Sequence, residues 1–326
     1  MNPTLFERKL DVSVILACYN QEPSLDLALE SLLNQNFSGR YEVIVCDDGS
    51  RVQLFNEFRD RFDKAKIPIR YVWQQDRGIA PGKSRNNGIK LSEGRLLLFL
   101  DGDMVPTLDL LEQHSSAHKK EYKLVVAGNR CWRSFDDLSR IDIHRMPIQE
   151  KLKLLEVLES SDPKLKERED NERKRRQEWL YSKHNWKVCF GCHFSVAWSL
   201  EVLFDDAIVG WSFDDWEIAY RLCIQYGYRP SYRDDFLAFH LETTEGMGNV
   251  FRRNKHEEIV LYLKSAFYFF DKCAGLSIDE VFFGLPRFEL NPVTNTWRVT
   301  PRPSSYELDK KVAFAKSWLK DNGIYP

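Results

Sequence analysis

Two carboxylates follow a short, fully apolar segment near the middle of the first half of the chain. Residues Leu96–Leu100 are all apolar, and Asp101, Gly102 and Asp103 come directly after them. A run of this length predicts a strand that is buried on both faces, as parallel strands are in α/β sheets. Carboxylates at the tip of such a strand could bind a divalent cation, with water and phosphate oxygens completing its shell. The alternative is an ordinary acidic turn, since Asp-Gly is a common turn pair.

A second group of carboxylates lies at the predicted start of a helix. Asp214 and Asp215 stand between Trp211 and Trp216, and apolar residues at helical spacing follow them. Acidic residues in the first turn of a helix are stabilised by its dipole, so helix capping is the simpler explanation. Carboxylates beside two tryptophans are more than a cap requires, so this segment is also a candidate functional site.

The segment Arg77–Gly88 is rich in glycine and basic residues and superficially resembles a phosphate loop. It contains Gly82, Lys83 and Ser84, but a P-loop needs a glycine five positions before Gly82, where Arg77 stands. The pattern therefore argues against an ATP-binding P-loop. A dinucleotide-binding dehydrogenase is excluded as well, because no G-x-G-x-x-G pattern follows the first predicted strand.

The elements that must position these residues alternate between strands and helices. Val12–Ala17 and Tyr41–Cys46 are β-rich, and Pro23 followed by an apolar stripe at helical spacing lies between them. Strand, helix and strand over this distance form a βαβ unit, which predicts parallel strands. Ile69–Trp73 and the apolar run before Asp101 continue the pattern, so we expect an α/β fold.

The composition is that of an ordinary globular protein. The 326 residues are 43% hydrophobic and 29% charged, which is enough for one large or two smaller domains. The net charge of -2, from 47 basic and 49 acidic residues, argues against a nucleic-acid binder, which usually has an excess of positive charge.

The seven cysteines are odd in number and scattered, which indicates a reducing compartment. Only Cys189 and Cys192 have the spacing of a metal or redox pair, and without a second pair structural packing is favoured. Met1–Leu10 lacks the apolar core of a signal peptide, and no apolar run approaches the roughly 20 residues that cross a bilayer. We expect a cytoplasmic protein, with peripheral contact at the inner face of the membrane left open.

Two later segments differ in composition from the rest of the chain. Residues 136–187 contain an almost entirely charged run, Lys164–Glu178, which predicts a solvated helix face or a helical flap near an acceptor. The apolar stripe of Glu257–Phe270 indicates core packing or docking on a membrane or partner. We expect a first domain over residues 1–245, with 136–187 as a charged helical insertion, and a helical extension over 246–326 that packs on it.

Five motifs in this order resemble family 2 glycosyltransferases of the GT-A fold. The motifs are Val14–Asn20, Asp47–Ser50, Arg85–Gly88, Asp101–Asp103 and the acidic helix start at Asp214. The likeness covers roughly residues 11–245 and implies a Rossmann-like, mixed and mainly parallel sheet flanked by helices. The Gly210-Trp211 opening also resembles the β-1,4-galactosyltransferase group. Cys18 and Ser84 depart from the residues that are common in the family, and neither changes a charged group.

The resemblance implies metal-assisted transfer from a nucleotide-diphosphate sugar, because a cation can neutralise the charge of the departing diphosphate. Asp103 should ligate the cation, and Asp101 should contact the ribose or bind through water. His240 matches a histidine that supplies a further ligand in some relatives, and a nitrogen ligand favours Mn²⁺ over Mg²⁺. The alternative is that His240 is simply buried and hydrogen-bonded.

The same resemblance assigns residues that bind the donor. Asp48 should accept an N–H from the nucleobase, which is consistent with uracil and hence with a UDP-sugar. Arg85 should approach the uridine or the acidic pair, or else form a structural salt bridge to Asp101. The further donor contacts that it implies are Tyr19, Asn20, Gly191 and Cys192.

Transfer also needs a base, because an acceptor hydroxyl is a poor nucleophile until it loses its proton. By resemblance Asp215 is this base, and Asp214 is the acidic residue just before it. A single displacement would invert the anomeric centre. Trp211 and Trp216 offer flat faces for stacking on the acceptor, or else are part of the core.

Two other functions stand as alternatives. A sugar-nucleotide pyrophosphorylase shares the general fold but usually has a glycine-rich basic loop after the first strand, where Cys18, Tyr19 and Asn20 stand. A catalytically silent carbohydrate- or nucleotide-sugar-binding relative should have lost the acidic pair or the base, and this chain keeps both. For the acceptor, the sequence leaves a glycan, a lipid-linked saccharide, a peptide or a small molecule open.

Overall fold

The computed structural model describes residues 8–50, 53–143, 145–158, 163–210, 213–242, 255–273, 275–282, 284–301, 303 and 305–326. Within these ranges the main sheet has eight strands in the order β3-β2-β1-β4-β7-β6-β8-β5. They are β1 (Leu10–Cys18), β2 (Tyr41–Asp47), β3 (Ile69–Trp73), β4 (Gly94–Asp101), β5 (Met104–Pro106), β6 (Leu124–Ser134), β7 (His193–Ala197) and β8 (Arg229–Glu242). β3, β2, β1 and β4 run parallel, as do β6 and β8, whereas β7 and β5 are antiparallel to their neighbours. The predicted mixed, mainly parallel sheet is confirmed.

Alternate residues of the central strands pack into two different cores. In β1, Val12, Val14 and Leu16 join one apolar cluster, and Ile15 joins the other. Side chains point to opposite faces in turn along a strand, so a strand covered on both faces is mainly apolar, and its buried polar residues need partners, as Ser13 has in Glu42. This explains why the strand segments of the sequence are mostly apolar runs.

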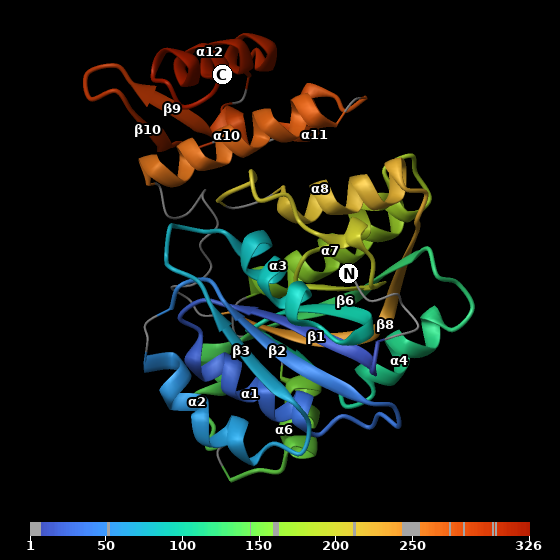
Figure 1. Ribbon diagram of the computed structural model, residues 1–326. Helices are drawn as coiled ribbons and strands as arrows, with labels where there is room; N and C mark the ends of the chain where they lie inside the picture. Colours follow the sequence, from blue (N-terminus) through green and yellow to red (C-terminus); the bar gives the residue numbers. More distant parts are fainter. Residues whose placement is uncertain are drawn as a thin grey trace.

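Helices cover both faces of the sheet (Figure 1). α1 (Glu22–Leu33), α2 (Gln53–Lys64) and α6 (Ile148–Val157) lie on one face, and α3 (Pro81–Leu91), α7 (Pro163–Leu180) and α8 (Asp214–Tyr220) lie on the other. As the spacing predicted, α1 has a proline in its first turn and buries Leu25, Ala28, Leu29 and Leu32. The shorter elements are α4 (Leu110–His118), α5 (Phe135–Leu138), η2 (Asn185–Val188), η3 (Leu200–Val202), η4 (Arg221–Gln225) and η5 (Leu285–Arg287).

The glycine-rich basic segment forms a helix rather than a phosphate loop. Gly82 lies in the first turn of α3, after Pro81 at its start. Gly88 lets this helix lie close to the sheet, because a Cβ atom there would be 2.3 Å from the Sγ atom of Cys46. The close approach brings Arg85, one turn earlier, to the edge where β4 ends.

The last part of the chain forms a unit that stacks beside α8 (Figure 1). It contains α10 (His256–Lys272), α11 (Ile278–Val281), the hairpin β9 (Phe288–Asn291) and β10 (Thr296–Val299), and α12 (Leu308–Asp321). The apolar stripe of α10 is buried, with Tyr262 and Phe269 packed against the Phe213 ring. Core packing of this stripe is therefore confirmed. The domain boundary predicted at residue 245 lies outside the described residues and stays a prediction.

The charge run on α7 is not solvated on every side. Glu172 and Arg176 are buried, and Arg176 is fully inaccessible. Arg130 of β6 donates to both carboxylate oxygens of Glu172 at 2.7 Å, and Arg176 donates to the Gly128 carbonyl at 2.6 Å. The outer side of α7 is solvated, as expected. The side that packs on β6 is not, because its charged residues Glu172 and Arg176 are buried.

The seven cysteines are free thiols, and Cys189 does not pair with Cys192. Burial raises the pKa of Cys192 to about 11, and Arg130 Nη1 donates to its Sγ atom at 3.3 Å. Structural packing of this pair is confirmed. Of the helices in the described ranges, none is both long and apolar enough to cross a bilayer.

Candidate active site

The acidic turns of the first half of the chain meet at one edge of the sheet. β1 lies between β2 and β4, and the register sets Cys18 beside Asp47 and Ala17 beside Asp101. Because the three strands are parallel, their carboxyl ends lie at the same edge, which is where open α/β sheets bind ligands. Asp48, the next residue after β2, therefore lies at the same edge as Asp101.

Arg85 joins the tip of β4 to the start of α8. Its Nη2 atom donates to Asp101 Oδ1 at 2.7 Å, and its Nη1 atom donates to Asp214 Oδ2 at 2.8 Å. The side chain is 4% exposed. Burial by itself would lower the pKa of this guanidinium, but the two carboxylates outweigh burial and raise it. The salt bridge to Asp101 that the sequence left open is present, and contact with a donor stays a prediction.

Gly191 packs directly on the guanidinium of Arg85. A Cβ atom on Gly191 would lie 3.1 Å from Arg85 Nη2, so a side chain here would press on the ion pairs. The backbone N–H of Gly191 donates to Asp215 Oδ2 at 3.2 Å. Gly191 therefore contacts both the bridging arginine and the predicted base, and Cys192 lies buried behind it.

Asp214 and Asp215 occupy the first turn of α8 but have different surroundings. Phe213 precedes them with a left-handed backbone (φ 78°), which turns the chain sharply into the helix. Asp214 is held by Arg85, whereas Asp215 accepts from the backbone N–H groups of Gly191 and, at 2.8 Å, of Trp216. Burial, with the nearby Asp214 charge, raises the pKa of Asp215 to about 6. A carboxylate poised near neutral pH suits a general base.

Asp103 and His240 are brought together by the pairing of β5 with β8. Met104 lies opposite His240 in this antiparallel pair, and His240 Nε2 lies 3.2 Å from Asp103 Oδ1. The Oδ1 atom of Asp103 and the Nδ1 atom of His240 are buried without a hydrogen-bond partner. Buried polar atoms are nearly always paired, so an unpaired carboxylate oxygen next to an imidazole fits a cation site.

The protein supplies few ligands at this place. In the part of the chain that the structure describes, no group of three or more histidine, cysteine, aspartate or glutamate side chains is arranged to hold a metal ion. The other oxygen of Asp103 accepts from Gln21 Nε2 at 2.6 Å. A cation here would need further oxygen ligands from bound substrate and water, which is the way Mg²⁺ and similar ions commonly bind.

Asp48 is buried at the opposite side of β1 from Asp101. Its Oδ1 atom accepts from Gln74 Nε2 at 2.5 Å, and its Oδ2 atom accepts from the backbone N–H of Ala80 at 2.8 Å. Burial raises the pKa of Asp48, although both hydrogen bonds partly oppose this. Each carboxylate oxygen has a second lone pair, so Asp48 can still accept one more N–H.

Tyr19 and Asn20 lie beside Asp48 at the end of β1. Tyr19 is 46% exposed, and its hydroxyl donates to Asp76 at 3.2 Å. Asn20 has a positive φ of 49°, and its N–H donates to Ser50 Oγ at 2.8 Å. These bonds fix the loop after β1 to the segments that follow β2 and β3, so the predicted nucleobase residues are grouped in space.

The two tryptophans predicted to bind an acceptor have different outcomes. Trp211 lies outside the described residues. The resemblance of Gly210-Trp211 to the β-1,4-galactosyltransferase group therefore stays a prediction. Trp216 is partly buried, with its ring 6.0 Å from Trp186 and 6.1 Å from Phe213 in edge-to-face contacts. Its packing matches the core role that the sequence left open, and a role in acceptor binding stays a prediction.

Several residues of this edge were not singled out from the sequence. They are Gln21, Gln74, Asp76, Arg130 and Glu172, together with Trp132, whose ring lies 4.2 Å from the His240 ring. Trp132 is covered in turn by the guanidinium of Arg168 from α7, at 3.7 Å. No local pattern marks these side chains, because each is defined by a partner that is distant in the sequence.

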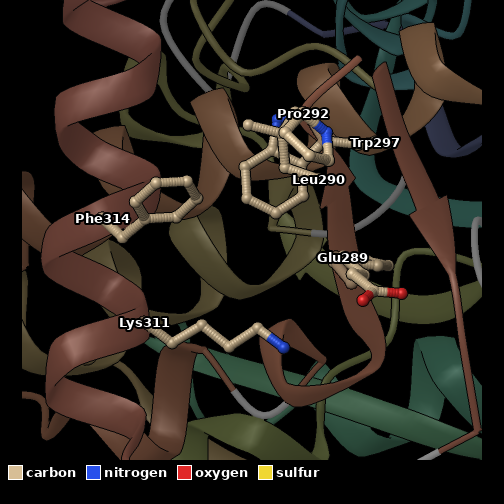
Figure 2. A pocket seen from close by; sticks show the side chains of 7 residues that line it. Glu289, Leu290, Pro292, Trp297, Lys311 and Phe314 are labelled. Carbon is tan, nitrogen blue, oxygen red and sulfur yellow. The ribbon is translucent and has the colours of Figure 1, made fainter. Parts of the chain in front are cut away.

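A cavity of about 260 Å³ lies elsewhere, in the C-terminal unit (Figure 2). It is lined by Phe288, Glu289, Leu290, Pro292, Trp297, Lys311 and Phe314. None of these residues was a predicted site residue, and Glu289, the one carboxylate of the lining, pairs with the exposed Arg298. The edge that carries Asp101 and Asp215 is therefore the better candidate for catalysis.

A sequence profile described as Glycosyl transferase family 2 matches residues 13–200, which is more than half of the chain. The matched range contains Asp48, Arg85, Asp101 and Asp103 and ends before Asp215. A curated relative named an uncharacterised glycosyltransferase, YfnE of Bacillus subtilis, is 29% identical over 262 residues. The match covers 72% of this chain and 65% of that protein, so the chain spans less than two thirds of this relative's length.

Two solved structures have the same fold. The mannosyltransferase PcManGT from Pyrobaculum calidifontis, in complex with GDP-Man and Mn²⁺, is 16% identical with a TM-score of 0.53, over 97% of this chain and 75% of that one. S. aureus TarS 1-349 in complex with UDP is 16% identical with a TM-score of 0.50, over 95% of this chain and 72% of that one. At this level of identity the likeness establishes the GT-A fold, which confirms the predicted fold class.

Proposed function

Because the chain belongs to glycosyl transferase family 2, we propose that it transfers a sugar from a nucleotide-diphosphate donor to an acceptor hydroxyl. The observation that carries this proposal is the bridge made by Arg85. Its two ion pairs, at 2.7 and 2.8 Å, tie Asp101 at the tip of β4 to Asp214, the neighbour of Asp215. The bridge therefore fixes the position of Asp215, the carboxylate with the raised pKa, relative to the strand tip that carries Asp101.

Asp103 and His240 are the residues that would hold a divalent cation, which when bound supplies positive charge to offset that of the departing diphosphate. The unpartnered Oδ1 of Asp103 and the imidazole 3.2 Å away support this role. The nitrogen ligand favours Mn²⁺ over Mg²⁺. The Mn²⁺ in the PcManGT complex is consistent with this choice.

Asp215 acts as the base in this proposal. Its carboxylate is oriented by the backbone N–H groups of Gly191 and Trp216, and its raised pKa of about 6 leaves it ionised yet basic near neutral pH. The acceptor hydroxyl transfers its proton to Asp215 while its oxygen attacks the anomeric carbon and the diphosphate departs. A single displacement of this kind inverts the anomeric configuration.

We propose a UDP-sugar as the donor, with Asp48 accepting the uracil N–H and with Tyr19, Asn20, Arg85, Asp101, Gly191 and Cys192 around the donor. The UDP in the TarS complex agrees with this, whereas the PcManGT complex holds GDP-Man. The acceptor is proposed to be a glycan or another hydroxyl compound that meets Asp215 from the side of Trp216 and the 136–187 insertion. Residues 246–326 are proposed as an extension that packs on the catalytic domain in a cytoplasmic or peripheral protein.

The proposal is tested by screening UDP- and GDP-sugars for nucleotide release in the presence of Mn²⁺ or Mg²⁺, with and without candidate acceptors. We expect release from at least one UDP-sugar, a strict requirement for the metal, and loss of release after chelation. Release from GDP-sugars alone would overturn the donor, and no release from any donor under any metal would overturn the activity.

A further inference from the structure

The segment Trp73–Asp76 contacts Asp48 and Tyr19, two of the residues that are predicted to bind the nucleobase. Gln74 donates to Asp48 Oδ1 at 2.5 Å, and Asp76 accepts from the Tyr19 hydroxyl at 3.2 Å. Trp73 Nε1 donates to the Ser50 carbonyl at 2.9 Å. The segment follows the end of β3, which is the strand next to β2, so it forms a further wall beside Asp48.

Trp73 is unusual within this wall because a large aromatic side chain is left open to solvent. It is the last residue of β3, in register with Asp47, and it is 45% exposed. Its polar edge is already held by the Ser50 carbonyl, and Ser50 also binds the N–H of Asn20 through its hydroxyl at 2.8 Å. An indole whose N–H is satisfied offers mainly its flat face to a ligand.

Aromatic packing does not account for the exposed face of the Trp73 ring. Tyr71, two residues earlier on the same face of β3, packs against the rings of Phe55 and Phe62 with centroids 5.1 and 6.2 Å apart. No ring contact or cation–π contact of Trp73 is found among the described residues. A rigid, half-exposed aromatic face one residue from the contact to Asp48 is what a nucleobase needs in order to stack.

We propose that Trp73 stacks on the nucleobase of the donor and, with the polar contacts of Asp48, sets the affinity for the nucleoside part. This inference rests on the proposed nucleotide-sugar donor and adds a residue that carries base recognition. Tyr19, which is 46% exposed, donates its hydroxyl hydrogen to Asp76 of the same segment. Stacking depends on the π-face and not on the diphosphate, so the effect should appear with uridine as well as with UDP.

The test compares Trp73→Leu and Trp73→Phe with the wild-type protein by calorimetric titration with UDP, uridine and inorganic diphosphate, each with Mn²⁺. Base–aromatic stacking accounts for about 5- to 150-fold in affinity. We expect Trp73→Leu to lose affinity in this range for UDP and uridine and none for diphosphate. Trp73→Phe should bind UDP and uridine nearly as tightly as wild type, because it keeps an aromatic face for stacking. It loses only the hydrogen bond to the Ser50 carbonyl.

Two controls separate stacking from general damage. Phe314→Ala removes an aromatic side chain of similar exposure (52%) on α12, remote from the strand ends, and should change none of the three affinities. Quenching of tryptophan fluorescence by uridine should be lost in Trp73→Leu and Trp73→Phe. Equal uridine affinity in wild type and Trp73→Leu would contradict the inference while leaving the activity intact. An equal loss for diphosphate would also contradict it, and a wild-type protein that binds no nucleotide would overturn the proposed function itself.

Discussion

Arg85 Nη1 lies 2.8 Å from Asp214 Oδ2, although the two residues are 129 positions apart in the chain. The other end of the same guanidinium is bound to Asp101. One planar side chain with two forks can hold two carboxylates at once, which a lysine cannot do with the same geometry. The position of the first turn of α8, and hence of Asp215, therefore depends on the tip of β4.

Replacing Arg85 by alanine should lower the free energy of unfolding by about 3–5 kcal/mol, because the buried Asp214 and the partly buried Asp101 both lose their partner. Urea unfolding at pH 7 measures this. The matched control is Arg175→Ala, an arginine on the exposed side of α7, which should stay within about 0.5 kcal/mol of wild type. An Arg85→Ala protein as stable as the control would mean that the bridge does not hold the two elements together.

The pH dependence of transfer should report Asp215. Its pKa is raised to about 6, and the proposed base must be ionised to act, so kcat/KM should fall as the pH decreases through 6 and level off above it. Asp215→Asn should abolish transfer, whereas its affinity for UDP should stay near that of the wild-type protein. Asp214→Asn provides the contrast, because it should mainly reduce stability through Arg85. Normal transfer by Asp215→Asn would show that the base is another residue.

Substitution at the proposed cation site should alter metal affinity before it alters the fold. Asp103→Asn removes the charge, so binding of Mn²⁺ in the presence of UDP should weaken at least about tenfold, since changes to outer-shell partners alone cost about 10- to 100-fold in metal affinity. His240→Gln should weaken Mn²⁺ more than Mg²⁺, since nitrogen ligands favour manganese. Electron paramagnetic resonance of free Mn²⁺ measures the affinity for manganese, and displacement of Mn²⁺ by Mg²⁺ gives the affinity for magnesium. Unchanged Mn²⁺ affinity in both variants would place the cation elsewhere.

A chain of buried histidines behind the sheet has only one consistent proton arrangement. The Asn129 carbonyl can only accept, so His193 Nδ1 carries a hydrogen and its Nε2 accepts from His114 Nε2 at 3.1 Å. His114 Nδ1 then accepts from the Ser195 hydroxyl at 2.7 Å, and Ser195 accepts from His118 Nε2 at 2.9 Å. All three rings are neutral in this arrangement.

Acid should therefore destabilise the protein at a pH above the range in which carboxylates of ordinary pKa titrate. Burial lowers the pKa of His193 to about 3 and of His118 to about 4, below the unfolded value of 6.5. The stabilisation is complete above pH 6.5 and is lost as the pH falls toward the folded pKa values. The free energy of unfolding should drop by about 1.4 kcal/mol per pH unit for each such histidine. Urea unfolding between pH 6.5 and 5 checks this, and a flat profile would contradict it.

The sheet could be predicted from the sequence because its strands obey a local rule. Val12–Ala17, Tyr41–Cys46 and Ile69–Trp73 are mainly apolar or β-branched, with one polar residue each, and each became a strand within one or two residues of the predicted limits. The hairpin of β9 and β10 was not predicted, since four-residue strands in a proline-containing tail have no comparable periodicity.

The sequence predicted the site residues that belong to local motifs, but not the distant partners that hold them in place. Asp101 ends β4 and Asp48 directly follows β2, so topology alone brings them to the same edge. Arg85 was correctly linked to Asp101, but its second partner, Asp214, depends on how α8 packs. The buried pair of Arg130 and Glu172 was missed for the same reason, because a run of mixed charge shows no sign of which carboxylate faces inward.

The most direct test of the account is a crystal structure with UDP and Mn²⁺, with the manganese located from its anomalous scattering. We expect one manganese peak within bonding distance of the Asp103 carboxylate and His240 Nε2, and the uracil against Asp48. A manganese peak and a UDP molecule that both lie away from residues 101–103 would contradict the proposed site and the mechanism built on it.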